Sequence, residues 1–212
     1  MNATKRIIDI LMTTLIVFLM SYQVTGEVAH EFIGVTMFIL VIIHQVLNLK
    51  WYSALFKGKY NPRRIIMTIV NVLLLILFLL TAISGTAMSN HAVQFLYNII
   101  NVNTARTMHL AFSYWSFILM GLHIGFHLNM ITAGMHSKYK KVFLIIFTII
   151  VIYGLYLFFR SEIINYITFK THFAFLDYEK NKLLVLFENI SMLVFFSSIA
   201  YYITKLISNK EI

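Results

Sequence analysis

Two pairs of histidines with the same spacing are the residues of this chain with the clearest potential for chemistry. His30 and His44 are 14 residues apart, and so are His109 and His123. In an α-helix this spacing is close to four turns, so both imidazoles of a pair point from one face, about 21 Å apart along the axis. Because neutral imidazole is a common metal ligand, each helix would offer one ligand at each of two levels.

Two such helices side by side match the axial ligation of two haems. Each haem iron takes two axial nitrogens from opposite sides of the macrocycle. We therefore predict that His30 and His109 bind one haem iron and that His44 and His123 bind the other. His127 follows His123 by one helical turn, and it is an alternative ligand of the second iron or a supporting residue.

Other residues near these histidines are candidates for contact with the haems. Gly34, Gly121 and Gly125 would let a helix backbone approach a flat macrocycle, although small residues also serve ordinary helix packing. Arg106 precedes His109 by three positions and could pair with a haem propionate. The remaining histidines are expected to be solvated side chains in loops: His91, His136 and His172.

The composition predicts an all-α integral membrane protein. Of the 212 residues, 60% are hydrophobic and only 12% are charged. Apolar segments of roughly 20 residues have the length needed to cross about 30 Å of hydrocarbon as helices. The chain has no cysteine, which excludes iron–sulfur clusters, thiolate ligation and covalent haem attachment. Bound haem would therefore be b-type.

Six transmembrane segments are expected, at about 7–24, 30–49, 65–83, 107–131, 142–159 and 183–203. A cleaved signal peptide is the alternative for the first segment, but no small-x-small cleavage site follows it. A short turn at Thr25, Gly26 and Glu27 separates the first two segments. Twelve of the 17 Lys and Arg residues fall on one side of this arrangement, while most acids fall on the other. By the positive-inside rule, both termini are cytoplasmic, and the net charge of +9 reflects topology, not nucleic-acid binding.

The topology makes the second and fourth segments parallel, with His30 and His109 at the outer level and His44 and His123 at the inner level. An internal repeat supports this pairing, because an offset of 79 residues aligns His30 with His109 and His44 with His123. The same offset aligns His127 with an asparagine, which favours His123 as the inner ligand. Residues 1–134 therefore read as a four-helix domain of two repeated helical hairpins, with 135–212 as an appended helix pair.

The chain resembles the flavinylation-associated cytochrome family of small bacterial membrane proteins. It is more distantly similar to dihaem cytochrome b subunits and ferric reductase-like membrane domains. The resemblance covers residues 1–134 and depends on these residues: His30, Gly34, His44, Asn48, Trp51, His109, His123 and His127. It implies electron transfer across a bacterial cytoplasmic membrane by two b-type haems, with an extracytoplasmic flavoprotein or another redox protein as acceptor. The chain itself has no flavin or nicotinamide motif.

We therefore expect a cytochrome that passes electrons from a quinol or a cytoplasmic dehydrogenase outward. One alternative is a quinone-reactive cytochrome b subunit of a larger oxidoreductase. An alternative from another class is a transporter or metal channel lined by histidines, for which the membrane segments supply few acidic partners. The outer segment 161–182 is rich in aromatic residues, and it is a candidate lid, docking surface or interfacial aromatic belt.

Overall fold

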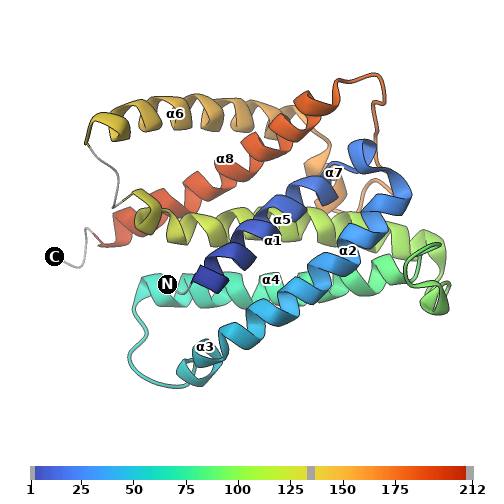
Figure 1. Cartoon of the computed structure of the whole chain (residues 1–212), viewed down its shortest axis with the longest axis horizontal. Coiled ribbons are helices and arrows are strands. Elements are labelled where there is room, and N and C mark those ends of the chain that lie inside the picture. The colour runs from blue at the N-terminus through green and yellow to red at the C-terminus, as the bar shows by residue number, and fades with distance from the viewer. Residues whose placement is uncertain (1–2, 133–136, 209–212) are drawn as a thin grey trace.

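The computed structural model describes residues 3–132 and 137–208, and all regular elements in these ranges are helices. Six long helices run back and forth along one axis (Figure 1). They are α1 (Ala3–Met20), α2 (Tyr22–Leu47), α4 (Pro62–Thr86), α5 (Val102–Thr132), α6 (Ser137–Arg160) and α8 (Lys182–Ser208). Short helices α3 (Leu49–Ala54), η1 (Gln94–Leu96) and α7 (Ile163–Ile167) lie in the connections. The all-α class expected from the sequence is confirmed.

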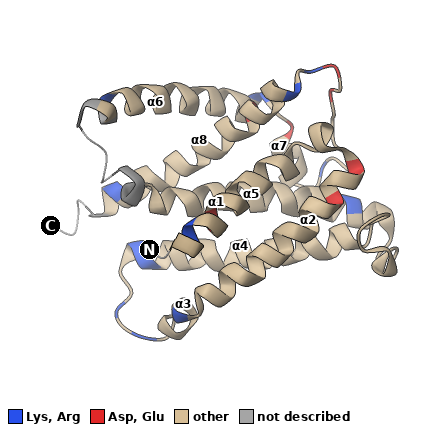
Figure 2. Cartoon of the chain, viewed as in Figure 1, with Lys and Arg blue, Asp and Glu red and all other residues tan. Residues whose placement is uncertain are grey.

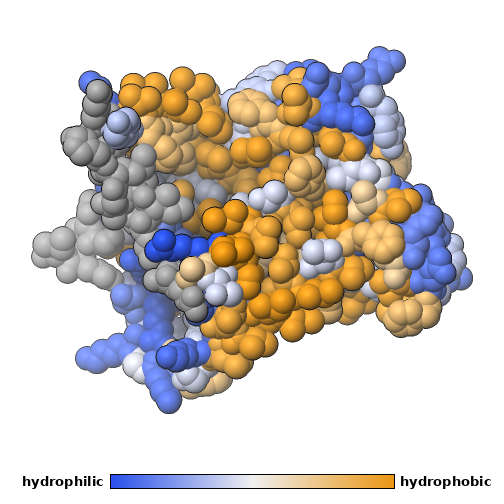
Figure 3. Space-filling model, viewed as in Figure 1, coloured by the Kyte–Doolittle hydropathy of each residue, from blue (hydrophilic) through white to orange (hydrophobic). Residues whose placement is uncertain are grey.

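Four of the described helices are long and apolar enough to cross a membrane: α2, α4, α6 over Lys141–Arg160, and α8 over Lys182–Ile207. The other two long helices, α1 and α5, coincide with the first and fourth expected segments, but they carry more polar residues. The space-filling view shows hydrophobic side chains across the middle of the visible face (Figure 3). Such a surface is suited to a membrane, where bilayer lipid replaces water around the middle of a protein.

Charged residues gather at the two ends of the long helices (Figure 2). Lys and Arg mark the end that contains α3 and the start of α4, whereas most acids lie at the opposite end. Asp9 is an exception, because it lies within α1. His136, which was predicted above to be solvated, and Lys210, one of the 12 Lys and Arg residues assigned to the cytoplasmic side, lie outside the described residues.

The first two helices are joined more tightly than the sequence suggests. Instead of a loop at 25–27, a single non-helical residue, Ser21, separates α1 from α2. A second break follows at Gly26, whose φ of 71° interrupts the helical geometry of α2. Glycine adopts this φ without the steric cost that a Cβ would impose. The two breaks together reverse the chain and bring α2 back along α1.

The start of α4 is held by two side chains. Asn61 caps the helix, because its Oδ1 accepts a hydrogen bond from the Arg64 backbone N–H at 2.9 Å. The guanidinium of Arg64 donates to the carbonyls of Ala54, Lys57 and Lys59 in the α3–α4 connection. These bonds fix where α4 begins, and so they fix the height of the residues that α4 presents to α5.

The C-terminal helix α8 packs into the same hydrophobic core as α1, α2, α4 and α5. One cluster of buried side chains joins Ile8 and Met12 of α1 to Leu193 and Phe196 of α8. Continuous packing of α8 against α5 crosses the boundary expected at residue 134. Figure 1 shows α6 on the outside of this arrangement. The C-terminal pair therefore contributes to the core through α8.

Glycines on α5 explain the close approach of α8. A Cβ on Gly121 would lie 2.5 Å from the Phe196 Cβ, and one on Gly125 would lie 2.1 Å from the Ser197 carbonyl oxygen. Both distances are too short for real contacts. These two glycines therefore serve helix packing against α8, which is the alternative given for them above.

Candidate functional site

The structure brings the four predicted histidines together as two pairs. The imidazole centroids of His30 and His109 are 6.1 Å apart, with an angle of 75° between the rings. Those of His44 and His123 are 6.5 Å apart, with an angle of 76°. One member of each pair comes from α2 and the other from α5, which run in the same direction (Figure 1).

These separations match the distance that a metal ion between two imidazoles requires. With metal–nitrogen bonds of about 2.0 Å and each ring centre about 1.1 Å behind its nitrogen, the centroids would be roughly 6.2 Å apart. A direct hydrogen bond between two ring nitrogens, at about 2.9 Å, would place the centroids only about 5.1 Å apart. The observed spacing exceeds that of a directly hydrogen-bonded pair and agrees with a ligand shared between the two rings at each level, although edge-to-face ring packing spans the same range.

Three of the four rings are held through Nδ1, and each partner comes from the preceding long helix. His44 Nδ1 lies 2.9 Å from Asp9 Oδ1. His123 Nδ1 lies 2.8 Å from Asn71 Oδ1. A carbonyl or carboxylate oxygen at Nδ1 fixes the tautomer with the proton on that nitrogen, which leaves Nε2 free to bind a metal.

The outer pair is held differently. His109 Nδ1 lies 3.0 Å from the main-chain carbonyl oxygen of Thr81. His30 Nδ1 is buried without a hydrogen-bond partner among the described residues, and its ring meets Tyr22 edge to face at 5.1 Å. His30 is therefore positioned by packing and by the nearby main chain of Leu19. A metal bound at its Nε2 would further fix the orientation of this ring.

His127 lies beside the inner pair. Its ring centroid is 5.2 Å from that of His123, at an angle of 65° between the rings. His44 therefore faces His123 at the spacing of a shared ligand, and His127 flanks that pair. This arrangement supports the choice of ligand that the repeat indicates.

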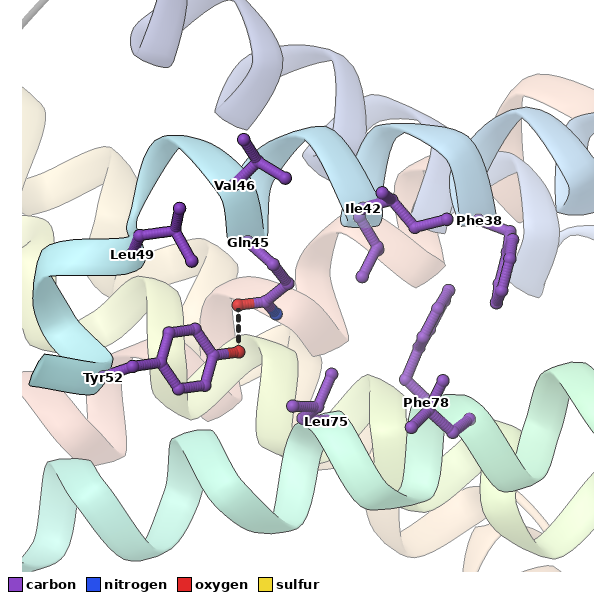
Figure 4. A pocket seen from close by; sticks show the side chains of 10 residues that line it. Phe38, Ile42, Gln45, Val46, Leu49, Tyr52, Leu75 and Phe78 are labelled. Carbon is purple, nitrogen blue, oxygen red and sulfur yellow. Dashed lines mark hydrogen bonds between the residues drawn. The ribbon is translucent and has the colours of Figure 1, made fainter. Parts of the chain in front are cut away.

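The packing around α2 is uneven. α2 packs along α1, whereas few of its residues approach α4. Between α2 and α4 lies a groove of about 360 Å³, with apolar walls that include Phe38 and Phe78 (Figure 4). Its polar contact is a 2.8 Å hydrogen bond from the Tyr52 hydroxyl to Gln45 Oε1, next to His44 in sequence. The groove runs along α2, the helix that carries His30 and His44, but none of the four paired histidines lines it.

Three further residues bear on whether a haem would fit beside the histidine pairs. A Cβ on Gly34 would meet only the Leu19 side chain, at 4.0 Å, so space remains beside this glycine. Arg106 is exposed at the outer end of α5, where it can reach an anionic group. At the inner end, Arg63 has a buried Nε without a hydrogen-bond partner among the described residues, and such a group calls for an anionic partner such as a propionate.

Comparison with known proteins does not identify the chain: no family model, no curated protein and no solved structure matches it. Its function must therefore be argued from its own residues and their geometry.

Gly85 is a site residue that the sequence analysis missed. A Cβ at this position would lie 3.0 Å from Cε1 and 3.2 Å from Nδ1 of His109. Thr81, one turn earlier on α4, provides the carbonyl oxygen that the same ring contacts. Glycine therefore lets the ring lie against the α4 backbone, where that carbonyl can orient it.

We expect Gly85→Ala to disturb the outer level selectively. The added methyl group pushes the His109 ring by a few tenths of an ångström and weakens its bond to Thr81, so the outer haem should be bound at reduced occupancy or with an altered low-spin electron paramagnetic resonance signal. Haem content and that spectrum measure the effect. Ile83→Ala, on the exposed face of the same turn, is the matched control. Two haems with unchanged signals in Gly85→Ala would contradict this role.

Glu27, Glu31 and His91 bring three potential ligand atoms within 4.8 Å of one another near the outer level. Both oxygens of Glu31 are already engaged, because they accept hydrogen bonds from the Ser89 hydroxyl and from three successive backbone N–H groups, 90–92. This arrangement ties the loop after α4 to the start of α2. We therefore interpret the cluster as a loop anchor and not as a metal site.

Replacing Glu31 should loosen this loop. Glu31→Leu leaves several N–H groups without their acceptor, at a cost of about 1–3 kcal/mol. We expect hydrogen exchange at the backbone amides of 90–92 to accelerate by roughly tenfold or more. Glu27→Leu, which removes only one bond from the Asn90 side chain, is the control. Equal exchange in the two variants would show that Glu31 does not anchor the loop.

The outer segment 161–182 packs on the outer half of α5. Trp115 Nε1 donates to the Ile167 carbonyl at 3.1 Å, and Tyr114 stacks on Tyr166 with ring centroids 4.7 Å apart. Burial raises the pKa of the Tyr166 hydroxyl, so it remains neutral where it accepts a bond from the Phe175 N–H. The segment is thus fastened to the bundle through its early aromatic residues, whereas Phe173, Phe175 and Tyr178 stay exposed.

The residues that contact the paired histidines were difficult to predict from the sequence. Asp9 was visible as an acid inside an apolar segment, which is a signal of function in a membrane helix. Asn71 and Gly85 had no comparable signal, because single polar or small residues are common in such helices. Their part in the site depends on which face of α4 meets α5.

Proposed function

We propose that this chain is a dihaem b-type cytochrome of a bacterial cytoplasmic membrane. It would carry electrons from a cytoplasmic or quinol donor to an extracytoplasmic acceptor such as a flavin-bearing protein. The observation that carries the proposal is the pair of facing imidazoles at each of two levels, with centroids 6.1 Å and 6.5 Å apart. The resemblance to flavinylation-associated cytochromes points the same way.

The residues of the chain would have distinct tasks toward the two haems. His30 and His109 would bind the outer iron, and His44 and His123 the inner iron. When bound, a haem iron supplies one-electron chemistry by alternating between the ferric and ferrous states. Asp9, Asn71 and the Thr81 carbonyl would hold three of the rings, and Arg106 and Arg63 would pair with propionates at the outer and inner ends.

The membrane arrangement in this proposal has six crossings with both termini in the cytoplasm. α1 and α5 would be the crossings beyond the four most apolar helices. The polar groups of both helices are used inside the bundle, as with Asp9 on α1 and His123 on α5, so they need not face lipid. The basic end of the bundle (Figure 2) would then be cytoplasmic by the positive-inside rule.

An absorption spectrum tests the proposed function most directly. Purified protein should show b-type α and Soret bands after dithionite reduction, with two haems per chain by the pyridine haemochrome assay. A correctly inserted and folded protein that binds no haem when haem is supplied would refute the cytochrome proposal. Stoichiometric binding of a divalent metal in its place would favour the transporter or channel alternative.

Single cysteines can test the topology, because the chain has none of its own. Lys57→Cys in the α3–α4 connection should be protected from an impermeant thiol reagent added to intact cells. Lys170→Cys in the outer segment should be labelled. The opposite pattern would reverse the proposed orientation.

The groove between α2 and α4 favours the alternative in which the chain reacts with quinol. Its apolar walls and the Tyr52–Gln45 hydrogen bond (Figure 4) would suit the tail and a ring hydroxyl of a quinol. In the quinone-reactive alternative, Tyr52→Phe should raise the KM for quinol at unchanged haem content. A Tyr52→Phe variant with unchanged quinol kinetics would place the donor elsewhere.

A further inference from the structure

The two levels differ in the charge that the histidine rings meet at Nδ1. At the inner level, His44 contacts the carboxylate of Asp9 at 2.9 Å. At the outer level, His109 contacts only the Thr81 main-chain carbonyl. The second inner ring contacts Asn71, which is a neutral amide. One formal negative charge therefore lies directly on an inner ligand, and none lies on an outer ligand.

The charge of Asp9 is not shared with a cation. Among the described residues, His44 is its one ion-pair partner. Lys5, one turn earlier on α1, donates instead to Asn48 Oδ1 at 2.9 Å. The acid nearest to the outer level, Glu31, stays charged and accepts hydrogen bonds from the loop after α4. Its charge acts on His30 through space, without a contact at Nδ1. The contrast between the two levels is therefore not cancelled by local ion pairs.

A carboxylate at Nδ1 has a definite effect on a metal-binding imidazole. It draws the Nδ1 proton toward itself and makes Nε2 a stronger donor, which stabilises the more positive oxidation state of a bound metal. A main-chain carbonyl does the same more weakly, because it carries only a partial charge. The result is a lower reduction potential at the level that contains the carboxylate.

Building on the proposed function, we propose that Asp9 is the positioning residue that makes the inner site the lower-potential site of the two. Electron transfer from the inner to the outer site is then energetically downhill. With haem bound at both sites, one electron would leave the inner iron, taking it from ferrous to ferric, and the same electron would reduce the outer iron from ferric to ferrous. The direction of flow is thus set partly by a carboxylate on α1, which touches neither iron.

Potentiometric titration of the purified holoprotein at one fixed pH tests this role. Asp9→Asn keeps the size of the side chain and removes its charge, so the inner haem should become easier to reduce, by about tenfold in its reduction equilibrium constant. The outer haem should be unchanged. The same substitution in a His109→Ala background, which should retain only the inner haem, assigns the shift to that site.

Three further variants complete the test. Asn71→Asp adds a carboxylate to the other inner ligand and should make the inner haem harder to reduce. Asp9→Glu should retain the original potential. Glu188→Gln removes a carboxylate that pairs with Lys180, remote from the histidines, and should change neither potential.

The outcomes separate this inference from the proposed function. Absence of haem from the unaltered protein would refute the function itself. Two haems with an inner potential that Asp9→Asn leaves unchanged, or a wild-type inner potential above the outer one, would overturn the role of Asp9. If Asp9→Asn fails to bind the inner haem, the Asn71→Asp variant provides the test. A lowered reduction potential of its inner haem supports the proposal, and an unchanged potential overturns it.

Discussion

A His109→Ala variant is expected to bind one haem per chain, where the proposed function predicts two for the unaltered chain. His109 and His30 face one another across 6.1 Å, so removing one ring leaves the outer iron with a single protein ligand. The inner pair lies about 21 Å away along the helices and should be unaffected. The pyridine haemochrome assay and the loss of one low-spin signal in the electron paramagnetic resonance spectrum measure the effect.

His172→Ala provides the matched control for this variant. His172 lies in the outer segment, and its Nδ1 is 2.9 Å from the Thr107 hydroxyl on the same helix as His109. It is exposed and belongs to neither pair, so both haems should remain. Retention of two haems in His109→Ala would show that the outer pairing is wrong. Loss of both would show that the two levels do not bind independently.

Replacing His123 and His127 separately should give opposite results. His123 faces His44 at 6.5 Å and is held by Asn71, so His123→Ala should lose the inner haem and keep the outer one. His127 flanks His123 at 5.2 Å. His127→Ala should therefore keep both haems, with at most a shifted inner absorption band.

Haem content and the spectrum of each purified variant measure this difference. Leu122→Ala, at the position before His123 on α5, controls for loss of side-chain volume near the inner pair. If His127→Ala loses the inner haem and His123→Ala retains it, the ligand is His127 and the repeat-based choice fails. Such a result would require α5 to rotate about its axis relative to its position in this structure.

The two levels of histidines and the Asp9 contact together predict the direction of electron transfer through the proposed cytochrome. Lys and Arg gather at the end that contains α3 and the start of α4 (Figure 2), and in the proposed topology this end is cytoplasmic. Among the described residues, Asp9 is the carboxylate that contacts a predicted ligand, His44. Outward electron flow would then follow from ordinary electrostatics: the donor side stabilises the oxidised metal, and the acceptor side does so less.

The sequence by itself determined the class of protein and the partners of the four histidines. Apolar length predicts helices in a membrane because a bilayer requires about 20 residues per crossing. A spacing of 14 residues places His30 and His44 on one helix face because the helical period is fixed. The offset of 79 residues then matched each of them with a histidine on α5, and the structure places those same rings opposite one another.

Only the tertiary structure decided which residues surround those rings. A membrane helix is apolar on every side, so its sequence pattern does not tell which face meets a neighbour. Asp9, Asn71 and Gly85 therefore became site residues only once α1 and α4 were seen against α2 and α5, while Gly121 and Gly125 proved to face α8. Helical periodicity is local and can be read along the chain, but the rotation of each helix about its axis is set by contacts between distant segments.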